Sequence, residues 1–449
     1  MRFSELDGRR IGVWGAGAET RSFALHAARS LPRARIAVVV LEEPADAPEL
    51  TGAGAAVVEA AGAVAALAGC DVVVRSPGVS IHRPELRALA ARGVPTVTPT
   101  GLWLAERAGR GVLGVTGTKG KSTTATMTAH LLAAAGVDVR LAGNIGRPAL
   151  DLLDTDGEDA LAVVELSSYQ IADLPAGPET AMVVNLFREH VDWHGDEAGY
   201  RRDKLRLLGL PEVRHTVVGS GDQAVIDAAR SGGAELFVFG RPDGWHVRPD
   251  GAVARGDAVM VAVTELPLPG AHNAANLGAA LTALDALGVA IPPLPAALHG
   301  LAALPHRLQL VHAAGGVSWV DDSISTTPES AIAALESFPD SPVVLIGGGL
   351  DRGQDHRELA ARLAARAATV IGMPETGERL VADARAAGAP ADRALVVADL
   401  PAAVVTAGAA ARRGGVVLLS PAAPSYHAYR NYVARGEHFL QLARAVGAS

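Results

Sequence analysis

The sequence predicts an α/β protein of three successive domains, each built around a mainly parallel sheet. The chain has 449 residues, which is too long for a single hydrophobic core. Short apolar runs typical of buried strands alternate with turns and helical stretches along its length. A glycine-rich sequence typical of phosphate binding opens the middle third. We therefore place the domains at residues 1–109, 110–304 and 305–449.

The first domain begins as a doubly wound sheet. Residues 10–14 form a short apolar strand, the glycine turn at residues 15–20 follows it, and further strands are expected at residues 36–41 and 71–74. The turn has Thr20 where a dinucleotide-binding fingerprint has its third glycine. It is therefore compatible with a nucleotide-like ligand and also with a simple tight turn at a strand end.

Residues 114–124, which read GVTGTKGKSTT, form the most informative motif of the chain. Glycines let backbone N–H groups close around phosphate oxygens, Lys121 supplies a positive charge, and Ser122 can reach a magnesium ion. The motif is a shortened form, GTKGKS, of the usual P-loop pattern. The predicted phosphate cradle consists of Gly117, Thr118, Lys119, Gly120, Lys121, Ser122 and Thr123.

Polar clusters follow two further strands of the second domain. Residues 161–164 lead into Glu165, and residues 181–184 lead into the stretch that carries His190. The carboxyl ends of parallel strands meet at one edge of the sheet, where ligands collect. A carboxylate and an imidazole at that edge can hold a metal that bridges nucleotide phosphates and an acyl oxygen. Taken alone, Glu165 and His190 would also fit ordinary loop positions. Taken alone, Lys204 is typical of a lysine on a solvent-exposed helix face.

The third domain repeats the alternation of strands and helices. Asp322 follows its first strand, where it can bind ribose hydroxyls or cap a helix. The alternation predicts a second parallel α/β sheet, with strands at residues 317–320, 343–346, 369–371, 394–397 and 415–419.

Composition excludes several classes of protein. The net charge of −8 argues against a nucleic-acid-binding surface. Cys70 is the only cysteine, so an intramolecular disulfide and a multi-cysteine zinc site are excluded. The amino terminus lacks the apolar core of a signal peptide, and the richest apolar stretch, residues 52–69, is too weakly apolar to span a bilayer. We expect a cytoplasmic monomer without nucleic-acid or membrane partners.

Taken together, the motifs resemble those of the Mur ligases. GTKGKST, ELSSYQ, NLFREHVDWHG, GAHNAAN, LPHR, DDS and LLSPAAPS occur in the order typical of that family. The resemblance covers the whole chain. It implies an N-terminal Rossmann-like UDP-binding domain, a central P-loop-type ATPase domain, and a C-terminal Rossmann-like domain that brings in the amino acid.

The resemblance also implies a reaction of peptidoglycan precursor synthesis. ATP would phosphorylate the terminal carboxylate of UDP-N-acetylmuramoyl-L-alanine, and the amino group of glutamate would attack the resulting acyl phosphate. Splitting amide formation in this way replaces a poor leaving group with a good one, so the enzyme mainly positions the reactants and neutralises charge.

Carried over to this chain, the family pattern assigns a role to each matching residue. Lys121 would neutralise the β- and γ-phosphates, and Ser122, Glu165, His190 and Lys204 would hold two Mg²⁺ ions, with Lys204 carbamoylated. The expected contacts are, for ATP, Asn273, Asn276, Arg307 and Asp322; for the UDP substrate, Ala18, Glu19, Ser76, Pro77, Gly78, Asn144 and Ser167; and for glutamate, Ser323, Thr326, Arg352, Ser425 and Tyr432.

The expected glutamate pocket departs from the pattern of the D-glutamate-adding enzymes. Ile324 and Arg352 stand where that pattern has lysines, and Tyr432 stands where it has phenylalanine. Enantiomers carry the same groups, so telling them apart requires moving at least one carboxylate partner. Arginine can grip a carboxylate bidentately where lysine offers a point charge. The stretches DDSISTTPESAIAALESF, GGGLDRG and LLSPAAPSYHAYRNYVARG resemble the L-glutamate-adding branch, in which a separate epimerase later inverts the glutamate.

We predict L-glutamate as the substrate, and drift at a D-glutamate site is the alternative. Folylpolyglutamate synthetase shares the phosphate loop and the central domain. That family lacks a UDP-binding amino-terminal domain, so the glycine turn and Ser76-Pro77-Gly78 count against it. A nucleotide-gated scaffold without enzymatic activity would be expected to lose Glu165, His190 or Lys204, and all three are present.

Overall fold

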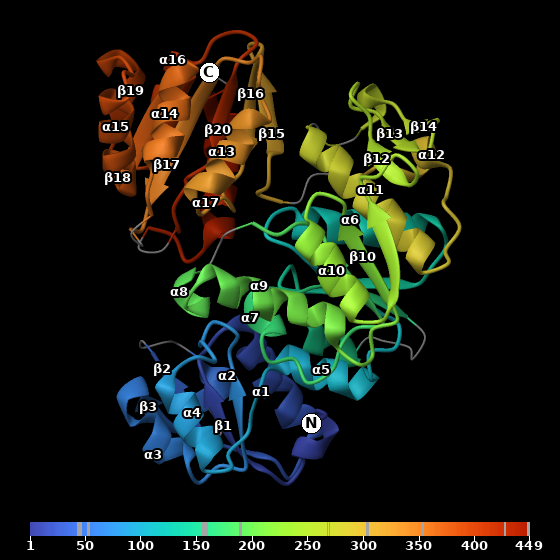
Figure 1. The fold of residues 1–449 in the computed structure, drawn as a ribbon. Coiled ribbons are helices and arrows are strands. Elements are labelled where there is room, and N and C mark those ends of the chain that lie inside the picture. Colours follow the sequence, from blue (N-terminus) through green and yellow to red (C-terminus); the bar gives the residue numbers. More distant parts are fainter. Residues whose placement is uncertain are drawn as a thin grey trace. The chain divides into compact units, whose positions relative to one another are not determined.

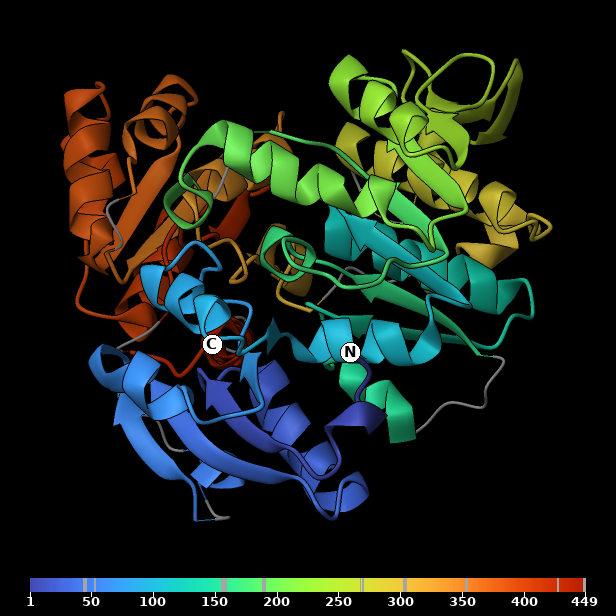
Figure 2. The ribbon, with the colours of Figure 1, turned by 60° about the horizontal axis from the view of Figure 1, so that its bottom comes forward.

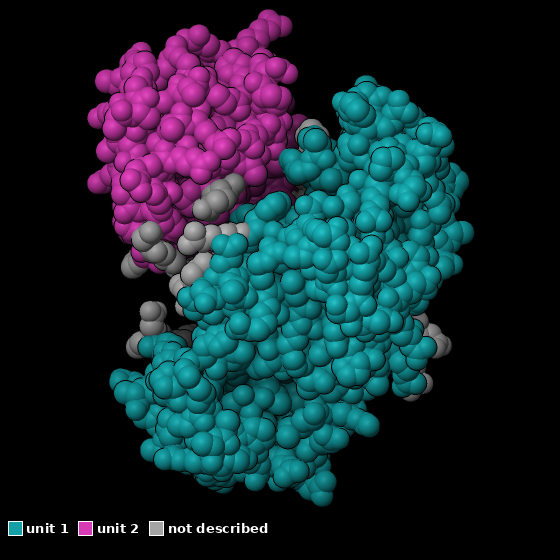
Figure 3. All heavy atoms as spheres, in the orientation of Figure 1, with its two compact units in different colours: residues 1–301 teal, residues 302–449 magenta. Residues whose placement is uncertain are grey.

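The chain forms two compact units, residues 1–301 and 302–449 (Figure 3). In this computed structural model, no helix of the described part of the chain has both the length and the apolar character needed to cross a membrane. The structure describes residues 1–42, 47–51, 54–154, 160–187, 191–266, 268, 270–301, 305–351, 354–425 and 428–446.

The first sheet of unit 1 has five parallel strands in the order β3-β2-β1-β4-β5. Its central strands are apolar and buried, whereas the edge strand β3 is largely exposed. The sequence did not predict β3 or the two-residue strand β5, because an exposed or very short strand lacks an apolar pattern. The elements are η1 (Ser4–Leu6), β1 (Arg10–Trp14), α1 (Ala18–Ser30), β2 (Arg35–Leu41), α2 (Pro48–Thr51), β3 (Ala56–Glu59), η2 (Ala60–Gly62), α3 (Ala63–Leu67), β4 (Val72–Arg75), α4 (Pro84–Ala91), β5 (Thr96–Val97) and α5 (Pro99–Arg107).

The second sheet of unit 1 has six parallel strands in the order β11-β10-β9-β6-β8-β7. Strand β6 lies between β9 and β8, so the segments that follow these three strands meet at one edge of the sheet, as predicted. The elements are β6 (Val112–Thr116), α6 (Lys121–Ala134), β7 (Val139–Gly143), η3 (Ala149–Asp154), β8 (Leu161–Glu165), α7 (Ser168–Ile171), β9 (Thr180–Val183), α8 (Val191–His194), α9 (Glu197–Leu205), η4 (Arg206–Gly209), β10 (His215–Gly219), α10 (Gln223–Ser231) and β11 (Glu235–Phe239).

A small antiparallel sheet and a long buried helix complete unit 1. The helix, α11, is rich in alanine and leucine because it packs against both α6 and β12 (Figure 1, Figure 2). This packing brings the start of α11 to the start of α6. The elements are β12 (Trp245–Val247), β13 (Val253–Arg255), β14 (Ala258–Val261), η5 (Val263–Glu265), α11 (Ala271–Ala286) and α12 (Leu294–Ala297).

Unit 2 contains a six-stranded sheet in the order β15-β16-β20-β17-β18-β19. Five strands are parallel as predicted, but β15 runs antiparallel to β16. The two strands are joined by a turn in which Gly315 and Gly316 have φ of 60° and 79°. That conformation favours glycine, so the Gly-Gly pair was the available signal for this hairpin.

Helices cover both faces of this sheet. Side chains of Val343 and Leu345 pack with α13, α14 and α15, while the alternate residues Val344 and Ile346 pack with α16 and α17. The elements are β15 (Gln309–Ala314), β16 (Val317–Asp321), α13 (Pro328–Glu336), β17 (Val343–Gly349), α14 (Arg357–Ala365), β18 (Thr369–Glu375), α15 (Thr376–Ala386), η6 (Ala391–Arg393), β19 (Ala394–Val396), α16 (Leu400–Ala410), β20 (Val416–Leu419) and α17 (Tyr432–Val446).

Candidate active site

The predicted phosphate loop runs from the end of β6 to the start of α6. Gly120, the residue before the helix, has φ of 76°, and a Cβ atom there would lie 2.6 Å from Oδ1 of Asn276. Glycine is therefore required both by the backbone conformation and by the close approach of α11. Lys121 and Ser122 form the first turn of α6, where free N–H groups and the helix dipole favour phosphate. Asn276 thus lies against the loop, with Asn273 one turn earlier on the same helix.

Asn185 fastens the phosphate loop. Its Oδ1 accepts hydrogen bonds from the backbone N–H groups of Thr118 (3.1 Å) and Lys119 (2.9 Å), and its Nδ2 donates to the Lys119 carbonyl (2.9 Å). The Thr118 hydroxyl lies 2.7 Å from that of Tyr200 on α9. Asn185 is not among the predicted site residues, although its position just beyond β9 beside the loop strand was the signal that could have found it.

Glu165 ends β8, next to the loop strand. It is 1% exposed, and its Oε1 accepts a hydrogen bond of 2.9 Å from Nδ2 of Asn144. Its Oε2 is buried and has no hydrogen-bond partner in the part of the chain that the structure describes. A buried carboxylate oxygen without a partner is costly, and oxygen atoms of this kind are the ligands that Mg²⁺ prefers. The residues present therefore fit a magnesium ion beside the phosphate loop.

Lys204 does not lie on a solvated helix face, so that interpretation is wrong. The side chain is 2% exposed, its Nζ donates a hydrogen bond of 2.6 Å to the Gly117 carbonyl, and it lies 5.0 Å from the centre of the Tyr200 ring. The fold thus brings Lys204 from α9 to the phosphate loop. His190 lies outside the described residues.

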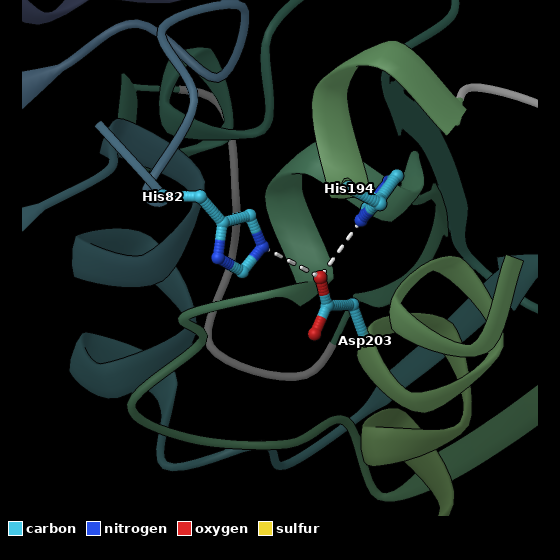
Figure 4. A group of neighbouring side chains, drawn as sticks. All are labelled: His82, His194 and Asp203. Atoms are coloured by element: carbon cyan, nitrogen blue, oxygen red, sulfur yellow. Dashed lines mark hydrogen bonds and ion pairs between the residues drawn. The ribbon is translucent and has the colours of Figure 1, made fainter. Parts of the chain in front are cut away.

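A hydrogen-bonded cluster adjoins Lys204. Figure 4 shows His82 and His194 both directed at one oxygen of Asp203, with distances of 3.2 and 2.7 Å. The other ring nitrogen of His194 lies 2.9 Å from the Ser168 hydroxyl. Burial lowers the pKa of His194, which favours a neutral ring that donates from Nδ1 to Asp203 and accepts from Ser168.

This cluster, which the sequence did not predict, connects three segments. The donor set of two imidazoles and a carboxylate also suits a metal ion. However, a separation of 2.7 Å is that of a hydrogen bond, and both ring nitrogens of His194 already have partners. We therefore interpret the cluster as a structural tie between α8, α9 and the loop that follows β4.

The predicted UDP-substrate segments meet in the first domain. Cβ atoms at Gly15 and Gly17 would lie 2.8 Å from Cβ and Oγ of Ser76, so the glycine turn allows the Ser76-Pro77-Gly78 loop to approach closely. A cavity of about 420 Å³ lies there, lined by residues that include Gly15, Glu42, Ser76, Gly78 and Arg83. The position of this cavity, beyond the carboxyl ends of β1 and β4, suits a nucleotide.

Arg75 holds the Ser76-Pro77-Gly78 loop in place. It is fully buried, its guanidinium donates to the carbonyls of Ser76, Pro77 and Val79, and it pairs with both carboxylate oxygens of Asp173 at 2.9 and 2.8 Å. Such a bidentate pair fixes orientation as well as charge. The sequence did not identify Arg75 as a site residue.

The other predicted UDP contacts have partners within the protein. The Glu19 carboxylate accepts hydrogen bonds from Thr100 and, at 2.7 Å, from Nε2 of Gln170, and burial raises its pKa. Ser167 caps α7 through a reciprocal pair of hydrogen bonds with Gln170. Ala18 begins α1, beside Glu19. Contact of these residues with a UDP substrate stays a prediction.

In unit 2, Arg307 lies on a strained loop. His306 and Leu308 on either side of it have φ of 63° and 44°, a left-handed conformation that non-glycine residues adopt rarely. Two acidic residues hold the loop: Oδ2 of Asp321 lies 2.7 Å from Nδ1 of His306, and Oδ1 of Asp322 accepts from the Leu308 N–H at 3.3 Å. Nε of Arg307 is buried and has no partner among the described residues.

Asp322 is 2% exposed and also accepts a hydrogen bond of 2.8 Å from the Ser420 hydroxyl. Burial raises its pKa to about 6. Both oxygens thus have protein partners in this conformation, and contact with a ribose stays a prediction.

Four of the predicted glutamate contacts, Ser323, Thr326, Ser425 and Tyr432, follow β16 or β20 in the chain. Ser323 donates a hydrogen bond of 2.8 Å to the Tyr432 carbonyl. Ser425, which precedes Tyr432 in the chain, is also buried. The Thr326 carbonyl accepts a hydrogen bond of 3.3 Å from Gln354. Arg352 lies outside the described residues. Arg435, which the sequence did not single out, donates to Oγ of Ser323 at 3.0 Å.

Comparisons with known proteins identify the family of this chain. The Mur ligase middle domain matches residues 115–284, and the Mur ligase glutamate ligase domain matches residues 306–423. The UDP-N-acetylmuramoyl-L-alanine--L-glutamate ligase of Xanthomonas euvesicatoria pv. vesicatoria is 42% identical, over 99% of this chain and 97% of its own. The chain belongs to the Mur ligase family. A protein of the same name from Micromonospora sp. is 43% identical, over 99% and 98% of the two chains.

The fold is also that of Mur ligases. The crystal structure of MurF ligase from Thermotoga maritima in complex with ADP is similar, with a TM-score of 0.61 at 16% identity, over 99% of this chain and 96% of that one. The predicted family and the predicted α/β fold class are therefore confirmed.

Proposed function

We propose that this Mur ligase is the ATP-dependent enzyme that joins L-glutamate to UDP-N-acetylmuramoyl-L-alanine in cytoplasmic peptidoglycan precursor synthesis. The names of its full-length relatives support this substrate pair. The observation that carries the chemistry is the buried group around the phosphate loop, in which Glu165 has a free carboxylate oxygen and Lys204 contacts Gly117.

In the proposed reaction, the carboxylate of the UDP substrate attacks the γ-phosphate of ATP, and ADP leaves. The amino group of glutamate then attacks the acyl carbon, loses a proton, and inorganic phosphate departs with the C–O bond electrons. Lys121 and the N–H groups at the start of α6 would neutralise the phosphates. Asn185 would hold the loop in shape by accepting hydrogen bonds from the N–H groups of Thr118 and Lys119. Arg307, from the strained loop of unit 2, would add positive charge to the phosphates.

Mg²⁺ would screen the phosphate charge and orient the acyl oxygen when bound. Ser122 and Glu165 would coordinate one Mg²⁺ ion. His190 and Lys204 would coordinate a second Mg²⁺ ion. Lys204 would serve as an anion after carbamoylation by CO₂. The carbamate nitrogen keeps one hydrogen, so Nζ would still be able to donate to the Gly117 carbonyl.

The choice of L-glutamate is supported by the altered carboxylate partners. Ile324 follows the buried Ser323, and its backbone N–H donates to the His306 carbonyl at 3.1 Å. Its side chain is alkyl where the D-glutamate-adding pattern has an ammonium, and Arg352 offers a planar fork where that pattern has a lysine. An L-glutamate product implies an epimerase that acts on it later in the same cell.

The test is phosphate release by the purified protein with ATP, Mg²⁺ and UDP-N-acetylmuramoyl-L-alanine, with L- and D-glutamate compared in parallel. We expect strong preference for L-glutamate. Preference for D-glutamate would overturn the stereochemical part of the proposal. If the protein releases no phosphate with either enantiomer, the proposed ligase activity is wrong.

A further inference from the structure

The loop that joins β4 to α4, residues 76–83, contacts two different parts of unit 1. Several of its residues line the first-domain cavity of about 420 Å³ in which the UDP group is proposed to bind, namely Ser76, Gly78, Val79 and Arg83. On the same loop, the Gly78 carbonyl and the side chains of Ser80 and His82 contact α8 and α9 of the central domain. A ligand in the cavity would therefore touch the short segment that also contacts the central domain.

Trp193 of α8 makes the first of these contacts. Its Nε1 donates a hydrogen bond of 3.2 Å to the Gly78 carbonyl, and its own carbonyl accepts one of 2.9 Å from the Ser80 hydroxyl. The residue is 8% exposed, and its ring stacks on that of Tyr169 with 4.6 Å between the ring centres. Trp193 is thus held between the loop and α7.

His82 makes the second contact, with Oδ2 of Asp203 at 3.2 Å (Figure 4). Its ring also meets that of Trp193 edge-on, at 5.7 Å between the ring centres. Asp203 directly precedes Lys204 on α9, and Nζ of Lys204 donates a hydrogen bond of 2.6 Å to the Gly117 carbonyl. A continuous series of contacts therefore runs from the wall of the UDP cavity to the phosphate loop.

The start of the β4–α4 loop is fixed by Arg75. This fully buried residue donates to the carbonyls of the loop and pairs with both carboxylate oxygens of Asp173. Close-packed interiors are stiff and transmit strain. A ligand that holds one side of this loop should therefore also limit the positions of Trp193 and His82 on its other side.

We propose that Trp193 and His82 are positioning residues that make the placement of Lys204 depend on the UDP group bound in the first domain. The proposal rests on the proposed function, in which Lys204 acts beside the phosphate loop. Binding energy from a remote part of a substrate can be used to position the reacting groups, and it then appears in kcat as well as in KM. The UDP group would thus accelerate a reaction that takes place at the alanine carboxylate.

The kinetic test compares two acceptors at saturating concentration, UDP-N-acetylmuramoyl-L-alanine and 1-phospho-N-acetylmuramoyl-L-alanine, which lacks the uridine and one phosphate. Both carry the same reacting carboxylate, so a difference in kcat reports the contribution of the remote group. In wild-type protein we expect kcat to be at least about tenfold higher with the complete substrate.

Two variants interrupt the series of contacts. Trp193→Phe keeps a ring against Tyr169 but removes the donor to Gly78, and His82→Phe keeps a ring against residue 193 but removes the contact with Asp203. Each change should lower the ratio of the two kcat values about threefold, which is the effect of losing one hydrogen bond. The double variant should make the two kcat values nearly equal.

The ratio distinguishes positioning from stability. A variant that is only less stable loses the same fraction of its activity with both acceptors. Trp245→Phe is the matched control, because Trp245 is 2% exposed and its Nε1 donates a hydrogen bond of 2.8 Å to Asp285. This change removes an equivalent hydrogen bond of a buried indole and should leave the ratio at its wild-type value.

Amide hydrogen exchange provides a measurement without turnover or metal. Addition of UDP alone should slow exchange in α8 and α9 of the wild-type protein, because a ligand that fixes the loop should also restrict the helices attached to it. In the double variant, UDP should leave the exchange of these helices unchanged.

The outcomes separate the two proposals. Wild-type protein that releases no phosphate with the complete substrate contradicts the proposed function. Equal kcat values for the two acceptors in an active wild-type protein contradict the positioning role alone. The wild-type ratio of kcat values in the double variant, or slower exchange on addition of UDP in that variant, would also contradict it.

Discussion

The two units both place polar groups beyond the carboxyl ends of parallel strands, but they do so with different chemistry. In unit 1 the site is a backbone loop on a helix N-terminus, held by Asn185 and Tyr200, with the buried charged residues Glu165 and Lys204 beside it. In unit 2 the corresponding edge is organised by buried charges, Asp321, Asp322 and Arg435, and by a strained loop.

The difference matches the groups that the proposed function assigns to the two units. Phosphates can be bound by successive N–H groups, which require a continuous glycine-rich segment. A carboxylate is recognised by a few charged side chains, which can come from distant positions. The first kind of site is therefore visible in the sequence, and the second is visible only after folding.

The largest expected effect concerns the free oxygen of Glu165. Glu165→Gln should lower kcat about 1000-fold, because it removes negative charge where a metal that stabilises the transition state is expected. Steady-state rates at increasing Mg²⁺ measure this, with the exposed Glu235→Gln as control. If kcat of Glu165→Gln stays within tenfold of wild type, Glu165 does not hold a catalytic metal and only accepts the hydrogen bond from Asn144.

A smaller effect is expected from the hydrogen-bonded cluster. Asp203→Ala removes the oxygen that both imidazoles contact, so α9 and Lys204 should lose their fixed position. We expect kcat to fall about 30-fold, because misplaced reacting groups slow the reaction. Asp196→Ala removes the N-cap of the same helix and controls for general loss of helix stability. Equal kinetic effects of the two changes would contradict a positioning role for Asp203.

The Gly120→Ala variant tests whether the phosphate loop needs a glycine at this position. Gly120→Ala places a methyl group against Asn276 and requires an unfavourable φ. We expect a loss of about 1–3 kcal/mol in the free energy of unfolding and a higher KM for ATP. Gly136→Ala, also at positive φ but with open space around it, should lose stability through strain without a change in KM. Equal KM values for the two variants would argue against contact between this loop and ATP.

The smallest expected effect is a change in stability with pH caused by the buried carboxyl of Asp322 in unit 2. The pKa of Asp322 is raised from 3.8 to about 6, so the folded chain keeps a proton that the unfolded chain has lost. Its contribution to stability is therefore present below about pH 4 and is lost as the pH rises through about 6. The Tm of Asp322→Asn relative to wild type should rise over that interval. A difference in Tm that stays constant with pH would show that Asp322 does not titrate in this way.

Much of the arrangement in unit 1 follows from local sequence. The glycine pattern, the apolar strands and the helix after them place Lys121, Ser122 and Glu165 at one sheet edge, because adjacent parallel strands end together. The burial of Lys204 could not be predicted from local sequence. A charged helix shows the same residue pattern whether it faces solvent or is covered by another element.

By itself, the sequence determined the α/β class, the family, the phosphate loop and the altered residues Ile324 and Arg352, because each depends on neighbouring residues along the chain. The tertiary structure decided what depends on contacts between distant segments. It gave Asp203 two imidazole partners, brought the backbone on both sides of Arg307 to positive φ, and buried Arg435 where it donates to the Ser323 and Ala423 carbonyls. The energy of such groups depends on burial and on their charge partners, which only the packed chain defines.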